Sequence, residues 1–173
     1  MQFCFLGKGF EDNANRMIFF CKSVIETVKR FGWPPDVIHC HGWMTSLIPS
    51  YLKDAYSNEP LFNNTKLVYS AYNSPHESSF NAESFIETAL TRNLEEKDLD
   101  IFKDANGNIN LNKGAMLRSD AIILASDQVN EDAKNTFESM DAPKLDANQD
   151  IEDKLPLYWE FFEPLVAEEQ ETE

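Results

Sequence analysis

The chain is 173 residues long, carries a formal net charge of −15 at pH 7 and is 42% hydrophobic. This length and hydrophobic content predict one globular domain with its own core, or part of a larger enzyme. The acidic balance argues against binding to nucleic acid or to an anionic membrane, because both would repel the chain. It suits a protein that handles neutral ligands.

The cysteines and the hydropathy indicate where such a protein works. Cys4, Cys21 and Cys40 show no paired spacing, which argues against a disulfide framework and favours a reducing compartment. No apolar run approaches the roughly 20 residues needed to cross a bilayer, and the first residues lack the basic stretch of a signal peptide. We therefore expect a cytoplasmic protein with no membrane partner.

The N-terminal part of the chain predicts a strand followed by a long helix. Residues 3–6 favour a strand, and Asp12 is placed as an N-cap, because its carboxylate can accept a hydrogen bond from a first-turn amide. Gly32 is expected to end the helix. The apolar stripe of this helix, at helical spacing, consists of Met17, Phe20, Val24, Val28 and Phe31.

A second strand and a second helix follow. The pair Pro34-Pro35 leads into a strand that begins at Val37-Ile38. Residues 43–56 predict an amphipathic helix with Pro49 near its first turn, where proline costs least. The next strand, residues 67–72, begins about 30 residues after the previous one, which is the period of a strand–helix–strand unit.

The remaining elements continue this alternation. The unbroken apolar run 121–125 predicts a parallel strand covered on both faces. Around it we expect helices over 82–90, 94–102 and 113–118, a loop over 104–110, and a helix capped by Ser126 or Asp127 that ends near Met140. The fold class is therefore α/β: a Rossmann-like, three-layer domain with a mostly parallel sheet. We expect this domain to span residues 1–140, followed over 141–173 by a polar linker, an aromatic helix (155–166) and an acidic tail.

Polar and aromatic side chains gather where the strand that begins at Val37 and the strand over 67–72 end. His39, His41 and Trp43 follow the first strand, and Tyr72 and Asn73 follow the second. In open α/β sheets, ligands bind at the carboxyl ends of the strands, so we expect a pocket at this corner. Aromatic, amide and imidazole groups suit sugar rings and hydroxyls, although the same residues would equally serve as ordinary packing.

Metal binding is not expected at either candidate position. His39 and His41 share a face, but no carboxylate or further ligand lies near them in sequence. The stretch that starts at Asp104 resembles the opening of an EF-hand loop, but Ile109 stands where a glycine is required and Ala115 where a glutamate is required. No Gly-x-Ser-x-Gly elbow, P-loop or dinucleotide fingerprint occurs, so we expect no bound cofactor.

Five ordered segments together resemble the bacterial glycogen synthases and plant starch synthases. The family patterns are D-N-x-x-R-F-x-F-F, then P-D-V-I-H-x-H-D-W-H-T with P-x-Y-L, then K-x-V-x-T-V-H-N, n-x-x-K-x-G-I-x-x-A-D and T-V-S. The matching residues are 11–20, 35–45 with 49–52, 66–73, 112–120 and 124–126.

The resemblance implies a fold and a reaction. The family has the GT-B fold, with substrates bound between two Rossmann-like halves, and this chain resembles the later part of the N-terminal half. The implied activity is ADP-glucose-dependent α-1,4-glucosyl transfer to a glucan such as glycogen. ADP-glucose would be the donor substrate, and a partner would supply the half that this chain does not resemble.

Two residues depart from the family's site. Gly42 stands where the family has the aspartate of H-D-W, and Tyr72 replaces the V-H-N histidine that contacts the glucosyl group. Trp43 and Asn73 are retained. The candidate substrate-binding residues are therefore His39, His41, Gly42, Trp43, Tyr72 and Asn73, and no residue is assigned a catalytic role.

Three hypotheses follow from the matches and the departures. The chain is a synthase region that is inactive alone, a non-catalytic pseudoenzyme that binds glucan or regulates a synthase, or an α/β interaction domain without a sugar site.

Overall fold

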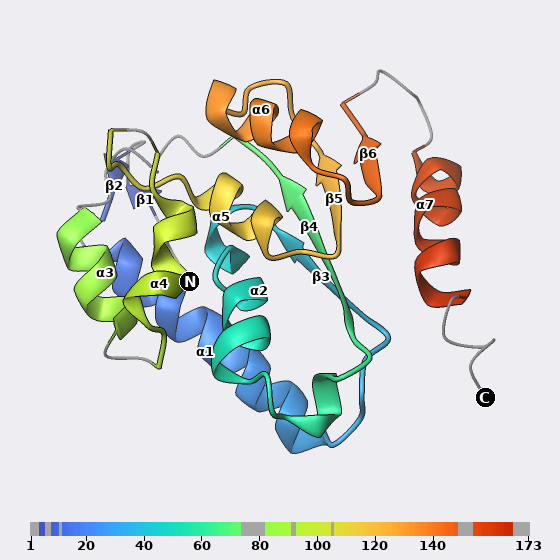
Figure 1. Cartoon of the computed structure of the whole chain (residues 1–173), viewed down its shortest axis with the longest axis horizontal. Helices are drawn as coiled ribbons and strands as arrows, with labels where there is room; N and C mark the ends of the chain where they lie inside the picture. The colour runs from blue at the N-terminus through green and yellow to red at the C-terminus, as the bar shows by residue number, and fades with distance from the viewer. Residues whose placement is uncertain are drawn as a thin grey trace.

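A four-stranded parallel sheet forms the centre of the molecule (Figure 1). The computed structural model describes residues 4–5, 8–10, 12–73, 82–90, 93–104, 106–148 and 154–167. The strands lie in the order β3 (Val37–His41), β4 (Lys66–Ala71), β5 (Ala121–Leu124) and β6 (Lys144–Asp146). A separate antiparallel pair consists of β1 (Cys4–Phe5) and β2 (Lys8–Gly9).

Helices cover both faces of this sheet, which confirms the predicted three-layer α/β fold. One face carries α1 (Asn13–Phe31), α2 (Ile48–Ser50), α3 (Ala82–Leu90), α4 (Glu96–Leu99), α5 (Leu111–Leu117) and α6 (Glu131–Ser139). Of the described helices, α7 (Leu155–Ala167) alone packs on the other face (Figure 1). None of the described helices is both long and apolar enough to cross a membrane.

The alternation of side chains along each strand separates two cores. In β4, Leu67 and Tyr69 belong to the large core beneath the helices, whereas Val68 faces α7. In β5, Ile122 and Ile123 divide in the same way. Because successive side chains of a strand point to opposite faces, a continuous apolar run is what such a doubly covered strand requires.

The helix α1 ends as predicted, but its buried face is rotated from the expected one. Gly32 adopts the left-handed conformation that terminates the helix (φ 65°). Asp12 makes no capping hydrogen bond, because its carboxylate is paired with Arg16 at 2.9 Å. Phe31 is 78% exposed, so its assignment to the buried stripe was wrong. The buried positions are Asn13, Met17, Ile18, Cys21 and Ile25.

The single helix expected over 43–56 is three short helical pieces. A 3₁₀ turn (Trp43–Thr45) is followed by α2, and a π-helical turn (Tyr51–Ala55) closes the segment. The amide of Tyr56 donates to the carbonyl of Tyr51 at 2.8 Å, the spacing of a π turn. Pro49 has no amide hydrogen to contribute, which removes one bond from the helical ladder.

Two further differences concern the C-terminal third. Asn130, and neither Ser126 nor Asp127, caps α6: its side-chain oxygen accepts a hydrogen bond from the amide of Ala133 at 2.8 Å. The segment expected to be a linker contributes β6, and its residue Leu145 packs into the core between the sheet and α7.

The helix expected over 94–102 is instead α4 followed by a 3₁₀ turn (Asp100–Phe102). The expected loop 74–79 and the expected tail 168–173 lie outside the described residues.

Candidate functional site

Two histidines lie side by side on one face of β3, near its carboxyl end and next to the end of β4. The rings of His39 and His41 lie 3.8 Å apart between centroids, tilted by 41°. His39 Nε2 lies 2.8 Å from Ser70 Oγ, and His41 Nδ1 lies 3.4 Å from Tyr72 Oη. The first distance is that of a good hydrogen bond and the second that of a weak one. The predicted common face of the histidines is confirmed, and Ser70 joins them because β4 runs in register with β3.

Gly42 turns the chain at this corner in a conformation that only glycine adopts readily. Its φ of 64° and ψ of −175° fall in the region that a Cβ atom makes inaccessible. Its amide donates to the carbonyl of Ser70 at 3.0 Å, which fixes the turn to the end of β4. A Cβ at position 42 would lie 3.7 Å from Cδ2 of Tyr72. The two positions that depart from the family pattern are therefore neighbours in space.

A buried polar network holds the backbone of Tyr72. Asn112 donates from Nδ2 to the carbonyl oxygen of Tyr72 at 2.9 Å. Its Oδ1 accepts a hydrogen bond from the hydroxyl of Tyr69, also at 2.9 Å. Asn112 and Tyr69 are both fully buried. Sequence reasoning missed this network, although an asparagine in the first turn of a mostly apolar helix was a signal for it.

Trp43 and Asn73 have other neighbours. Trp43 is half-buried and packs against the core beneath the helices, on the face of the sheet opposite to His39. Asn73 is exposed and donates from Nδ2 to Oε1 of Gln128 at 3.1 Å. The structure thus brings His41 and Tyr72 together, whereas Trp43 packs on the opposite face of the sheet and Asn73 contacts Gln128.

The C-terminal helix covers the buried side of this corner. The ring of Phe162 lies 5.1 Å from that of His39, and Tyr158 stacks on Phe162 at 6.4 Å. This contact was not predicted, because nothing in the composition of an aromatic helix says which face of a sheet the helix covers.

Burial keeps the corner neutral. Loss of solvent, and to a smaller extent the neighbouring imidazole of His41, lower the pKa of His39 to about 4. Burial also lowers the pKa of His41. The Cys40 thiol, on the opposite face of β3, has its pKa raised to about 12 by burial, so it stays protonated. At neutral pH the corner offers uncharged imidazole and hydroxyl groups as hydrogen-bond donors and acceptors.

Replacing His39 by glutamine is expected to flatten the pH dependence of stability. The unfolded chain protonates this imidazole near pH 6.5 and the native state only near pH 4, so the unfolded state binds more protons in between. The contribution of the neutral His39 imidazole to the free energy of unfolding is fully present above pH 6.5 and is lost as the pH falls towards 4. Since the ring is partly solvated, we expect a loss on the order of 1–2 kcal/mol.

Urea unfolding of the wild type and of His39→Gln across this pH window measures the effect. The carboxylates titrate in both proteins, so the difference between the two curves isolates His39. If the free energy of unfolding of the two proteins changed equally with pH, the assignment of this pH dependence to His39 would be contradicted.

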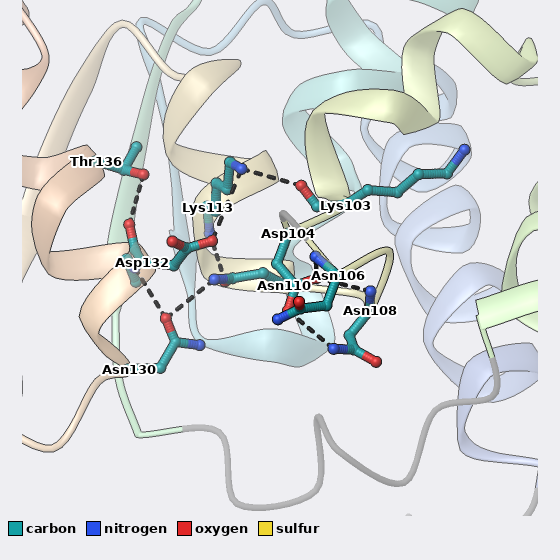
Figure 2. A network of polar contacts seen from close by, with 10 residues as sticks. Lys103, Asp104, Asn106, Asn108, Asn110, Lys113, Asn130, Asp132 and Thr136 are labelled. Carbon is teal, nitrogen blue, oxygen red and sulfur yellow. Dashed lines mark hydrogen bonds and ion pairs between the residues drawn. The ribbon is translucent and has the colours of Figure 1, made fainter.

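The candidate calcium loop is a tight polar turn, as predicted (Figure 2). Asp104 Oδ1 accepts from the amides of Asn106 and Asn108, both at 2.8 Å, and Oδ2 accepts from Nδ2 of Asn108 at 3.0 Å. Lys113 donates to the carbonyl of Lys103 at 3.0 Å and so ties α5 to the base of the turn. Within the described part of the chain, no group of three or more His, Cys, Asp or Glu side chains is placed to hold a metal ion.

Comparison with known proteins places the chain in one family. Residues 2–145 match the model of the starch synthase catalytic domain. Glycogen synthase 2 of Geobacter metallireducens is 40% identical over 118 residues, and that of Geobacter sulfurreducens is 37% identical over 118 residues. Each match covers 68% of this chain and 24% of the relative. The chain thus spans about a quarter of the length of these relatives.

A solved structure shares the fold. The catalytic domain of starch synthase IV from Arabidopsis thaliana, bound to ADP and acarbose, superposes with a TM-score of 0.57 at 22% identity. The match covers 68% of this chain and 24% of that one. From the family match over residues 2–145 and the shared fold, we conclude that the chain belongs to the starch synthase catalytic domain family, as a glycogen synthase-like glycosyltransferase region.

Proposed function

We propose that this region does not transfer glucose by itself and instead binds glucan through the corner of β3 and β4. The observation that carries the proposal is the pairing of Gly42 with Tyr72. Gly42 occupies a backbone conformation closed to the family's aspartate, and Tyr72 lies beside it in place of the family's histidine. The two departures from the family pattern thus change the same corner of the site, which we call the rebuilt corner.

The rebuilt corner removes groups that the resemblance assigns to transfer. Glucosyl transfer depends on positioning the substrates and on stabilising developing charge. Gly42 has no side chain to orient a sugar hydroxyl. Tyr72 presents a phenol whose oxygen lies 3.4 Å from Nδ1 of His41. Neither residue replaces an ionised carboxylate or a titratable imidazole in the family's position.

The chemistry that remains suits a neutral carbohydrate. The corner offers uncharged imidazoles, the phenol of Tyr72, which is 37% exposed, and the exposed amide of Asn73. Such groups bind sugar hydroxyls and stack on sugar rings without any charge on the ligand. A net charge of −15 would not oppose a neutral polymer. We assign this role to residues 1–140, with residues 141–173 as an added C-terminal segment, in a cytoplasmic protein.

A second candidate function is ADP-glucose-dependent α-1,4-glucosyl transfer to glucan, completed by a partner that supplies the other half of the GT-B fold. The 40% identity to a glycogen synthase favours it. The chain spans 24% of that relative, so the donor-binding residues would have to come from elsewhere.

Co-sedimentation with glycogen tests the glucan-binding proposal. We expect the chain to pellet with glycogen, and Tyr72→Ala to weaken binding about tenfold, equivalent to about 1.4 kcal/mol. Phe31→Ala is the matched control, because this aromatic side chain is 78% exposed and lies outside the corner. Failure to pellet at high glycogen concentration, or equal loss in both variants, would overturn the proposal.

A further inference from the structure

Asn106 and Gly107 form the single Asn-Gly pair in the sequence. Both residues are exposed, and they lie in the polar turn that begins at Asp104 (Figure 2). An asparagine side chain can be attacked by the backbone nitrogen of the next residue, and glycine at that position offers no side chain to hinder the approach. The reacting atoms therefore all belong to these two residues.

The side-chain amide of Asn106 is not held in place. In the same segment, Nδ2 of Asn108 donates to Asp104 at 3.0 Å. Likewise, Nδ2 of Asn110 donates to Asn130 at 3.0 Å. Among the described residues, none forms a hydrogen bond to the side chain of Asn106, whose backbone amide is bonded to Asp104. The carboxamide carbon of Asn106 is therefore free to turn toward the nitrogen that follows it.

Gly107 leaves room for this approach. Its φ of 81° lies in the left-handed region, and a Cβ built at this position would meet nothing within 4 Å. Ring closure requires the peptide group between Asn106 and Gly107 to rotate. Glycine permits this rotation at low cost, because it occupies both positive and negative φ readily.

Asp104 restrains the same peptide group. The backbone amide of Gly107 donates to the carbonyl of Asp104 at 3.1 Å. Oδ1 of Asp104 accepts hydrogen bonds from the amides of Asn106 and Asn108, both at 2.8 Å. The nitrogen that must attack is thus engaged in the turn, and it becomes available only when the turn opens.

We propose that Asn106 is a site of spontaneous modification, in which its carboxamide closes on the nitrogen of Gly107, and that Asp104 slows this reaction. The Gly107 nitrogen gives its proton to hydroxide and forms a bond to Cγ of Asn106. The bond from Cγ to Nδ2 breaks, and Nδ2 takes a proton from water and leaves as ammonia. Water then opens the cyclic imide. Addition of water at Cγ gives aspartate, and addition at the backbone carbonyl carbon gives isoaspartate.

The two products differ in their effect on the turn. Both add one negative charge to a chain whose net charge is −15, but isoaspartate also inserts a carbon atom into the backbone between Asp104 and Asn108. The base of the turn pairs Lys103 with Ile109, and Ile109 is buried. We expect the isoaspartate chain to unfold at a lower urea concentration than Asn106→Asp, which adds the charge alone. Equal unfolding midpoints would contradict this effect of the inserted atom.

Peptide mapping of the full chain during incubation at mildly alkaline pH tests the proposal. Mass spectrometry detects the mass gained when an amide becomes an acid, and labelling by an isoaspartyl methyltransferase identifies isoaspartate. We expect both products to accumulate at Asn106, whereas Asn63, which is also exposed but precedes Asn64, stays intact over the same period. An unmodified Asn106, or equal conversion at Asn63, would overturn the proposal.

Two variants separate the reaction from its restraint. Gly107→Ala places a methyl group beside the attacking nitrogen and should slow conversion on the order of tenfold in urea, where the left-handed backbone of the turn plays no part. Asp104→Ala should speed conversion of the folded chain on the order of tenfold and leave the rate in urea unchanged. A rate in urea unaffected by Gly107→Ala would contradict attack by this nitrogen. Equal rates for folded wild type and Asp104→Ala would contradict the role of Asp104.

Discussion

Replacing Gly42 by aspartate, the residue of the family pattern, is expected to lower the free energy of unfolding by about 2–3 kcal/mol. The backbone at Gly42 has φ 64° and ψ −175°, a combination that a Cβ atom makes inaccessible. The corner must shift to accept a side chain, and the bond from the Gly42 amide to Ser70 holds it in place. Urea unfolding of the variant measures the loss.

Gly32→Asp is the matched control for this substitution. Gly32 has almost the same φ, 65°, but its ψ of 17° is the left-handed helical conformation that Asp and Asn tolerate. A Cβ there meets nothing within 4 Å. Although an added carboxylate at a helix C-terminus carries a small penalty, we expect the cost at Gly32 to be the lower of the two. If both substitutions lowered the free energy of unfolding equally, the backbone at Gly42 would not impose the expected strain, and the prediction would be contradicted.

Gly114→Ala is expected to destabilise the chain by about 2–3 kcal/mol, although alanine is the better helix former. Gly114 lies inside α5 against the ring of Phe102, which is fully buried. A Cβ added at Gly114 would overlap three carbon atoms of that ring. The overlap outweighs the gain in helix propensity of about 1 kcal/mol, because no flexible side-chain end is available to move aside.

The compensating change at Phe102 tests this explanation. In the Gly114→Ala background, Phe102→Leu should recover part of the lost stability, whereas Phe102→Leu alone should destabilise the wild type. Such a sign reversal in a double-mutant cycle identifies steric overlap as the cause. A Gly114→Ala protein that melts at or above the wild-type temperature would contradict it.

Local signals in the sequence located most of the sheet and its helices. The unbroken run at β5 and the strand–helix period between β3 and β4 predicted parallel strands, because both depend only on side-chain alternation and chain length. The break-up of 43–56 was harder to foresee, since Pro49 is tolerated early in a helix and the π turn at Tyr51–Ala55 depends on tertiary packing. β6 was missed because three residues, Lys144–Asp146, show too little periodicity.

The corner itself was only partly predictable. The shared face of His39 and His41 follows from their spacing of two in a strand. The contact of Gly42 with Tyr72 needed the register of two strands and a backbone angle, which no sequence pattern specifies. Likewise, Asn112 reaches the Tyr72 carbonyl across 40 positions of sequence.

The placement of α7 was not predictable from the sequence. An aromatic helix after a polar segment indicates burial, but the surface that it covers is assembled from residues of all four strands of the sheet. α7 lies beyond the family match, which ends at residue 145, so the resemblance gave no guidance either. Its contact with His39 through Phe162 is therefore a finding of the structure alone.

Incubation of the pure chain with labelled ADP-glucose and glycogen tests the central claim most directly, namely that the rebuilt corner no longer transfers glucose. Glycogen synthase 2 of Geobacter metallireducens serves as the positive control under the same conditions. The account predicts no label in the precipitated polymer above a protein-free blank, even where the chain binds glycogen. Label that accumulates in proportion to the amount of chain would contradict it.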